Sequence, residues 1–129
     1  MRYYIASKLE NAPRVRQMRD HLNNLGHQQT YDWTTHGPVY GAGLQRLTEV
    51  SIHEINGVLL ADVVIVLWPG GRGTHVELGA AIAANKRVAF ISPLAEHHSA
   101  TAETCAFYHH PLVTRFTSIA HFMTSPEIG

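Results

Sequence analysis

The feature that most constrains the fold of this chain is the run at residues 63–68 (VVIVLW), which is continuously apolar and largely β-branched. Such a run is typical of a parallel strand buried on both faces of its sheet. Parallel strands need crossover connections of a dozen or more residues, usually helices. The run therefore predicts an α/β architecture and directs attention to the segments on either side of it.

Strand and helix patterns alternate along the rest of the chain. Further strands are expected at residues 3–7, 29–33, 87–92 and 112–116, from their β-branched and aromatic content. Helices are expected in the other segments. The first begins behind an N-cap at Asn11, and the others cover residues 47–59, 74–85 and 118–123. Residues 34–43 are expected to form a loop. This order predicts one α/β domain, a doubly wound parallel five-stranded sheet of flavodoxin or Rossmann type with helices on both faces. Ligands bind such sheets at the carboxyl ends of the strands.

Composition excludes several classes of function. The 10 Lys and Arg balance the 10 Asp and Glu, so the basic surplus of a protein that binds nucleic-acid polymers is missing. The longest apolar run, residues 58–68, contains Asp62 and is shorter than the roughly 20 residues that span a bilayer. The single cysteine, Cys105, and ten scattered histidines predict no internal disulfide and no metal site. We expect a small cytoplasmic domain with no membrane partner, metal or organic cofactor.

Residues 69–79 (PGGRGTHVELG) form a glycine-rich turn that enters a helix. Backbone N–H groups and the helix dipole at such a turn suit an anion or sugar hydroxyls. No Gly-Lys-Ser/Thr follows, so the turn is not a Walker loop, and a dinucleotide fingerprint would need a glycine at Val76. The turn predicts substrate contacts from its glycines, its arginine and its threonine, namely Gly70, Gly71, Arg72, Gly73 and Thr74.

Glu77 has two interpretations. Thr74-x-x-Glu77 has the spacing of a capping box, in which Thr74 is the N-cap and Glu77 returns to its amide. Alternatively, the glycines clear space for a ligand, and a glutamate in the first helical turn stays ionised beside it. Such a carboxylate is able to act as a nucleophile.

Residues 69–77 match the Pro-Gly-Gly-x-Gly-Thr-x-x-Glu signature of the cytokinin-activating phosphoribohydrolases. The whole chain, residues 1–129, more closely resembles a single domain of the nucleoside 2-deoxyribosyltransferase family, including its nucleotide N-hydrolase branch. That resemblance is carried by Tyr-Ile-Ala-Ser at 4–7 and by Ala-Asp-Val-Val-Ile-Val at 61–66 before the glycine turn. Both families cleave the N-glycosidic bond between a base and a (deoxy)ribose.

The resemblance implies roles for individual residues. Glu77 stands at the position of the nucleophile, and Tyr4 at that of the tyrosine that orients it. Glu54 stands eight residues before Asp62, where the nucleotide hydrolases of the family carry an aspartate that contacts the sugar or base. Gly71 departs from the family pattern, which has a Ser or Asp there.

Further substrate contacts are expected at the same edge of the sheet. Trp33 is placed to stack on a base, and Asp32 to contact or protonate a base edge. Ser7 and Arg14, with Asn11 and with Arg72 from the turn, are candidates for a 5′-phosphate site. As the proton donor to the leaving base, Glu54 and Asp32 remain alternatives.

The expected function is cleavage or transfer at the N-glycosidic bond of (deoxy)nucleosides or nucleotides through Glu77. A nucleoside 5′-monophosphate hydrolase is the alternative within that class, and a non-catalytic nucleotide-derivative sensor is the alternative outside it. The partner is a small-molecule nucleoside or nucleotide. The resemblance also implies a homodimer or higher homo-oligomer, in which the region of Thr101 and Thr104 lies near the neighbouring subunit's site.

Overall fold

A computed structural model describes residues 1–128 of the chain. Five strands form one sheet, namely β1 (Arg2–Ala6), β2 (Gln28–Gln29), β3 (Val63–Leu67), β4 (Arg87–Ile91) and β5 (Val113–Phe116). Their spatial order is β2-β1-β3-β4-β5, and every neighbouring pair is parallel. The predicted doubly wound α/β fold is confirmed. The chain places β2 on one side of β1 and then β3, β4 and β5 on the other side, so the strand order reverses between β1 and β3.

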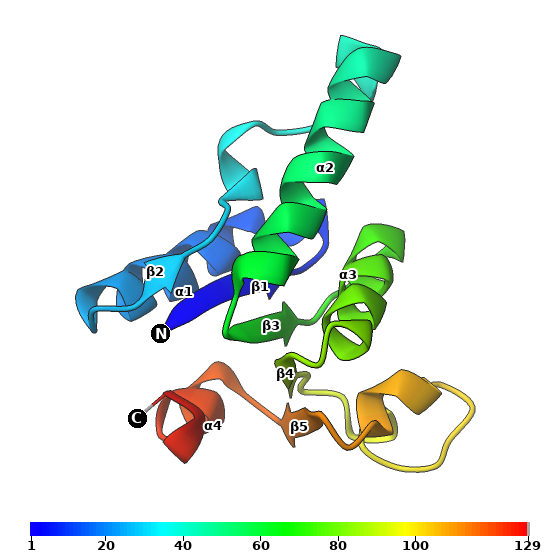
Figure 1. Cartoon of the computed structure of the whole chain (residues 1–129). Helices are drawn as coiled ribbons and strands as arrows, with labels where there is room; N and C mark the ends of the chain where they lie inside the picture. The colour runs from blue at the N-terminus through cyan, green and yellow to red at the C-terminus, as the bar shows by residue number, and fades with distance from the viewer. Residues whose placement is uncertain (129) are drawn as a thin grey trace.

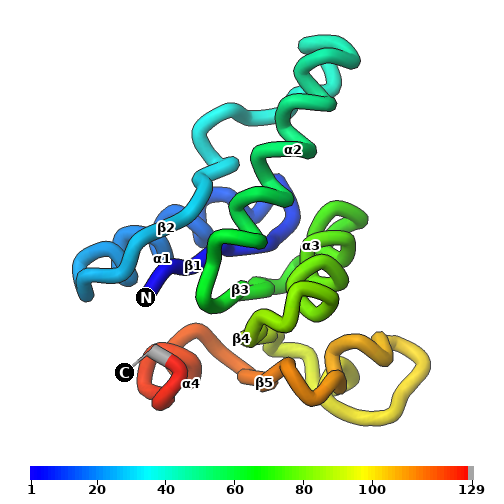
Figure 2. Tube along the Cα trace, viewed as in Figure 1, coloured from blue at the N-terminus to red at the C-terminus, as the bar shows by residue number. Residues whose placement is uncertain are grey.

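Four α-helices cross between the strands or follow them: α1 (Ala12–Asn24), α2 (Leu44–Leu60), α3 (Arg72–Ala83) and α4 (Ile119–Met123). Figure 1 shows α2 and α3 as neighbours, while the first turns of α2 extend beyond the strands (Figure 2). Leu44 at that projecting end is accordingly 83% exposed. Short 3-10 helices occupy the connections at η1 (Leu9–Asn11), η2 (Trp33–Thr35), η3 (Tyr40–Ala42), η4 (Ala95–His97), η5 (Ala106–His109) and η6 (Pro126–Ile128).

The two tyrosines of β1 show how the sheet is covered on both faces. Successive side chains of a strand point to opposite faces, and both rings are fully buried. The Tyr3 hydroxyl donates to Oδ1 of Asn23 on α1 at 2.7 Å, whereas the Tyr4 hydroxyl reaches Glu77 on α3. Helix α1 therefore covers one face, and α3 covers the face that carries Tyr4.

Two element boundaries differ from the prediction. Strand β2 has only two residues instead of 29–33, because the chain turns into η2 at Asp32, which caps that helix. Helix α3 begins at Arg72, behind an N-cap at Gly71, rather than at Thr74. Both shifts alter which side chains reach the carboxyl edge of the sheet.

Candidate active site

An open cavity of about 400 Å³ lies where β1 and β3 end, at the point where the strand order reverses. Its walls come from the residues after β1, the glycine turn and first turns of α3, the inner side of α2, and the segment between β2 and α2. Open α/β sheets bind their ligands at this topological position. The cavity is therefore the candidate active site.

Glu77 lies in the wall of this cavity and is only 7% exposed. Its Oε2 accepts a hydrogen bond of 2.5 Å from the hydroxyl of Tyr4. Burial, which disfavours a charged carboxylate, raises the pKa of Glu77 to about 8. The Tyr4 hydrogen bond opposes this rise, and the negative charge of Glu54 adds to it.

The expected capping box is wrong. Because α3 begins two residues earlier, Thr74 is its third residue, and the Thr74 hydroxyl accepts a bond of 3.0 Å from the Gly71 amide. Glu77 lies beyond the first turn, where the helix dipole is weaker, and its carboxyl group turns to Tyr4 instead of a main-chain amide. The expectation that the dipole keeps Glu77 ionised is also wrong, since burial dominates.

Glu54 extends from α2 into the same cavity and is partly buried. Burial raises the pKa of its carboxyl group, while the nearby ring of His36 opposes that rise. The structure thus brings together the three residues expected to carry the chemistry, with Tyr4 behind Glu77 and with Glu54 on the cavity wall.

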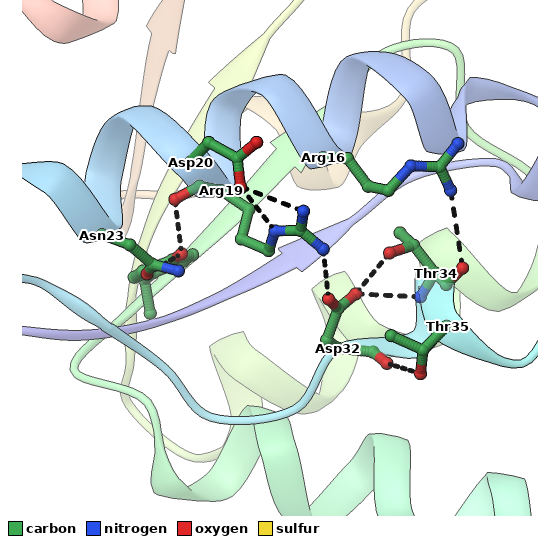
Figure 3. A network of polar contacts seen from close by, with 8 residues as sticks. Arg16, Arg19, Asp20, Asn23, Asp32, Thr34 and Thr35 are labelled. Carbon is green, nitrogen blue, oxygen red and sulfur yellow. Dashed lines mark hydrogen bonds and ion pairs between the residues drawn. The ribbon is translucent and has the colours of Figure 1, made fainter.

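Asp32 does not belong to the cavity lining, contrary to its expected contact with a base. Figure 3 shows its carboxylate held by Arg19 of α1 and by Thr34. Arg19 donates a bond of 2.7 Å, and the Thr34 amide a bond of 3.0 Å. Burial disfavours the Asp32 anion, but these hydrogen bonds outweigh it and hold the pKa of Asp32 below its usual value. Asp32 is a structural anchor for η2.

Trp33 does line the cavity, but most of its side chain is part of the core. It is 4% exposed, and its indole Nε1 donates a bond of 2.7 Å to the carbonyl of Ile5. The indole is therefore fixed by the end of β1, and only a small part of its surface is open to a ligand.

The glycine turn contributes Gly71, Arg72, Gly73 and Thr74 to the lining, as expected. Gly70 packs closely against Thr74, because a Cβ at position 70 would be 3.1 Å from Cγ2 of Thr74. Since Gly70 is absent from the lining, its expected ligand contact is replaced by packing within the turn.

The expected phosphate residues are only partly brought together. Ser7 lines the cavity, where its hydroxyl donates to the Leu67 carbonyl at 2.7 Å and accepts a bond from Nδ2 of Asn11. Asn11 thus stands at the N-cap of α1 without using its side chain to cap that helix. Arg14 is exposed on α1 and does not line the cavity, contrary to expectation. Lys8, which the sequence did not single out, lines it together with Arg72.

Most of the lining that sequence reasoning missed comes from the segment expected to be a loop and from the start of α2. These residues are His36, Gly37, Pro38, Val39, Tyr40, Leu47 and Val50, with Leu9 and Glu10 after β1. The loop carries no hydrophobic periodicity, so the only available signal was its position after a strand at the carboxyl edge.

The segment with Thr101 and Thr104 lies outside the cavity lining. The Thr104 hydroxyl donates to the His97 carbonyl at 2.8 Å, and that of Thr101 donates to the Glu96 carbonyl at 2.6 Å. Neither threonine therefore contributes to this chain's own cavity, and their expected place near a neighbouring subunit's site stays a prediction.

Neither a metal-binding cluster nor a membrane-spanning helix is present within residues 1–128. No group of three or more His, Cys, Asp or Glu side chains in this range is placed to hold a metal ion. No helix in the same range has both the length and the apolar character needed to cross a membrane.

No protein-family model matches this sequence. No curated protein matches it either. Among solved structures, a Clostridium botulinum CMP N-glycosidase, BcmB, superposes with a TM-score of 0.64 at 16% identity, over 95% of this chain and 94% of that one. A 2-deoxyribosyltransferase from Bacillus psychrosaccharolyticus superposes with a TM-score of 0.54 at 21% identity, over 74% of this chain and 75% of that one. The chain thus has the fold of these two structures, as its resemblance to the deoxyribosyltransferase family implied.

Proposed function

We propose that this chain is an enzyme that cleaves or transfers the N-glycosidic bond of (deoxy)nucleosides or nucleotides, with Glu77 as nucleophile. The observation that carries the proposal is the buried Glu77 carboxyl group in the wall of an open cavity, bonded through Oε2 to the Tyr4 hydroxyl. The names of the two structural neighbours, a CMP N-glycosidase and a 2-deoxyribosyltransferase, support the same type of bond.

In the proposed reaction, the free Oε1 of ionised Glu77 attacks the anomeric carbon. The bond from that carbon to the base breaks, and its electron pair leaves with the base, which takes up a proton. The transition state resembles an oxocarbenium ion and is stabilised by the nearby anion. The resulting glycosyl ester is released by a second base in a transferase or by water in a hydrolase.

Tyr4 acts as a positioning residue in this scheme. Its hydroxyl occupies Oε2, so it favours the charged form of Glu77 and fixes the plane of the carboxyl group. Burial acts in the opposite direction and raises the pKa of Glu77, so the Tyr4 hydrogen bond is needed to counter the effect of burial on the nucleophile.

A hydrolase specific for nucleoside 5′-monophosphates is the second candidate. Lys8 and Arg72 line the cavity beside the start of α3, where main-chain N–H groups favour an anion. This arrangement suits a phosphate on the sugar, and it favours nucleotides over nucleosides.

The deciding experiment is incubation of purified protein with nucleosides, deoxynucleosides and their 5′-monophosphates, with and without a free acceptor base, followed by chromatography of the products. Base exchange identifies a transferase, and free base with free sugar identifies a hydrolase. Mass spectrometry of a 2-fluoro-substituted substrate, which slows ester release, is expected to find the sugar on Glu77. Glu77→Gln is the matched inactive control. If the protein binds members of this panel but turns none of them over, the enzyme proposal is wrong and the non-catalytic sensor is favoured instead.

We further propose that the chain forms a homodimer or higher homo-oligomer in the cytoplasm. Helix α2 exposes Leu44, Ile52 and Leu59, and α3 exposes Val76, which together give neighbouring helices apolar surface suited to a second copy. Sedimentation velocity of the wild type and of Ile52→Glu tests this, with loss of association expected in the variant.

A further inference from the structure

His75 of α3 joins the glycine turn of the candidate active site to a distant segment of the chain. Its Nδ1 lies 2.7 Å from the carbonyl oxygen of Gly71, and its Nε2 lies 2.8 Å from the hydroxyl of Tyr108 in η5. Gly71 lines the cavity, whereas His75 and Tyr108 do not. The imidazole therefore links a residue of the cavity wall to a residue outside it.

The two partners of the His75 ring fix the positions of its hydrogens. A carbonyl oxygen only accepts hydrogen bonds, so Nδ1 of His75 donates to Gly71. In the neutral ring Nε2 is then the acceptor, and the Tyr108 hydroxyl donates to it. The order of donation thus runs from Tyr108 to His75 and from His75 to Gly71.

Tyr108 is the fixed end of this series of hydrogen bonds. Its side chain is buried, and its ring stacks on that of Phe90 in β4, with the centroids 4.1 Å apart and 20° between the ring planes. Phe90 is itself fully buried in the core. The glycine turn is therefore attached, through His75 and Tyr108, to the core at β4.

The carbonyl group of Gly71 sets the direction of the next N–H group. In a trans peptide the C=O of one residue and the N–H of the following residue point in opposite directions. The main-chain N–H and the Nδ1 of His75 hold the Gly71 oxygen toward the helix, at 3.2 and 2.7 Å. The N–H of Arg72 is therefore held outward from the start of α3, where Arg72 lines the cavity.

The glycines of the turn make this restraint important. Gly70 and Gly71 have no side chains to limit rotation of the peptide planes. Rotation of the plane between Gly71 and Arg72 would present a carbonyl oxygen in place of an N–H group, and the partial negative charge of that oxygen repels an anion. The main-chain N–H groups of Arg72, Gly73 and Thr74 meet no main-chain acceptor within residues 1–128, so they suit an anionic part of a substrate.

Building on the proposed function, we propose that His75 is a positioning residue for the phosphate group of a nucleoside 5′-monophosphate. Held by Tyr108, it keeps the peptide plane between Gly71 and Arg72 in the orientation that presents N–H groups to the phosphate. His75 itself touches no part of the substrate. The connection between β4 and β5 thus contributes, through Tyr108, to a preference for nucleotides over nucleosides.

The test compares the nucleoside 5′-monophosphate that the wild type cleaves best with the corresponding nucleoside. In His75→Ala and in Tyr108→Phe, the ratio of kcat/KM for the monophosphate to that for the nucleoside is expected to fall about three- to tenfold, the effect of losing one hydrogen bond. The double variant is expected to lose no more than His75→Ala, because Tyr108 acts through His75. Tyr108→Phe keeps the ring that stacks on Phe90, so it remains informative if His75→Ala does not fold.

His98→Ala is the matched control. His98 lies on the same connection between β4 and β5, where its Nε2 is 2.9 Å from the carbonyl oxygen of Ser92, and it does not line the cavity. Its removal is expected to leave the ratio unchanged. A wild-type ratio in both His75→Ala and Tyr108→Phe, or an equal fall in His98→Ala, would overturn the inference. Losses that multiply in the double variant would overturn it as well.

A second measurement does not depend on turnover. Calorimetric titration with ribose 5-phosphate is expected to give a Kd about three- to tenfold higher in His75→Ala and Tyr108→Phe than in the wild type, and an unchanged Kd in His98→Ala. Failure of the proposed function gives a wild type that cleaves no member of the substrate panel, and the role of His75 is then decided by the Kd values alone. Equal Kd values in all four proteins, or no binding of ribose 5-phosphate to the wild type, would contradict that role.

Discussion

Gly57 of α2 lies directly against the ring of Tyr4, so that a Cβ at position 57 would be 2.8 Å from Cδ2 of that ring. The same added Cβ would be 2.9 Å from the Cβ of Tyr31. Glycine is needed here for close approach between a helix and a strand, and Tyr4 in turn is bonded to Glu77.

Gly57→Ala is therefore expected to displace the Tyr4 ring and disturb its bond to Glu77. Overpacking of a close contact of this kind costs about 1–3 kcal/mol, and kcat is expected to fall with it. Gly79→Ala on α3 is the matched control, because no atom lies within 4 Å of its added Cβ. In urea unfolding, the free energy of unfolding of the control is expected to rise by roughly 0.5–1 kcal/mol, and its kcat is expected to stay unchanged. The same result for Gly57→Ala would contradict the packing argument.

Tyr4→Phe removes the hydroxyl that stabilises the Glu77 anion while it keeps the ring in the core. The pKa of Glu77 is then expected to rise further, which moves the ascending limb of the profile of kcat/KM against pH to higher pH. Tyr3→Phe, which loses a hydroxyl bonded to Asn23 on the other face, is expected to leave that limb in place. A Tyr4→Phe profile that overlays the wild-type profile would rule out this role for the hydroxyl.

Glu77→Gln is expected to abolish turnover and to change how stability depends on pH. The carboxyl group has an ordinary pKa of 4.5 and a pKa of about 8 in the folded protein, so the folded state binds the proton more tightly. Wild-type stability is thus fully present below about pH 4.5 and falls as the pH rises toward 8, by up to about 1.4 kcal/mol per pH unit. The glutamine variant has no carboxyl group to ionise, so its free energy of unfolding lacks this decrease. Urea titrations of the wild type and the variant at pH 5 and pH 8 measure the difference.

Arg72→Ala tests the proposed phosphate contact at the start of α3. The ratio of kcat/KM for a nucleoside 5′-monophosphate to that for the nucleoside is expected to fall about tenfold, which corresponds to one hydrogen bond of roughly 1.4 kcal/mol. Arg14→Ala, at an exposed position outside the cavity lining, is expected to leave the ratio unchanged. A fall in the Arg14 variant alone would restore the original expectation for that residue.

Asp32→Asn is expected to destabilise the fold by about 1–3 kcal/mol. The asparagine oxygen can still accept from Thr34, but its NH2 group cannot accept from Arg19, so the charged hydrogen bond is lost. The lowered pKa of Asp32 means that its contribution is present above its ordinary value of 3.8 and is lost as the pH falls below it. The variant's deficit in unfolding free energy should consequently shrink in acid. A selective loss of substrate binding at full stability would instead make Asp32 a ligand contact.

The fold was predictable because it depends on patterns that are local in sequence. The buried run of β3 and the helical patterns on either side of it require parallel strands with crossovers, and alternation along β1 places Tyr3 and Tyr4 on opposite faces. The association of Tyr4 with Glu77 came from family resemblance, since 73 residues separate the two and no local rule joins them.

The errors have both distant and local physical origins. Asp32 was assigned to a ligand because it follows a strand, but Arg19 approaches from α1 and takes its carboxylate. The helix start was misplaced for a local reason, because Gly71 and Thr74 are N-cap residues of similar preference and the helix begins behind Gly71. His36 was missed because only the folded chain brings the segment after η2 to the cavity wall.

The proposed reactive groups of the cavity and much of its apolar wall come from different segments of the chain. Tyr4 lies on β1 and Glu77 on α3, whereas the wall from Pro38 to Tyr40 lies on the connection between β2 and α2, outside the sheet. Under the proposed function, mutations that accumulate at positions 38–40 are therefore expected to change which substrates fit this wall while leaving the Tyr4–Glu77 pair intact, so that descendants of one ancestor diverge in preference while keeping a common chemistry.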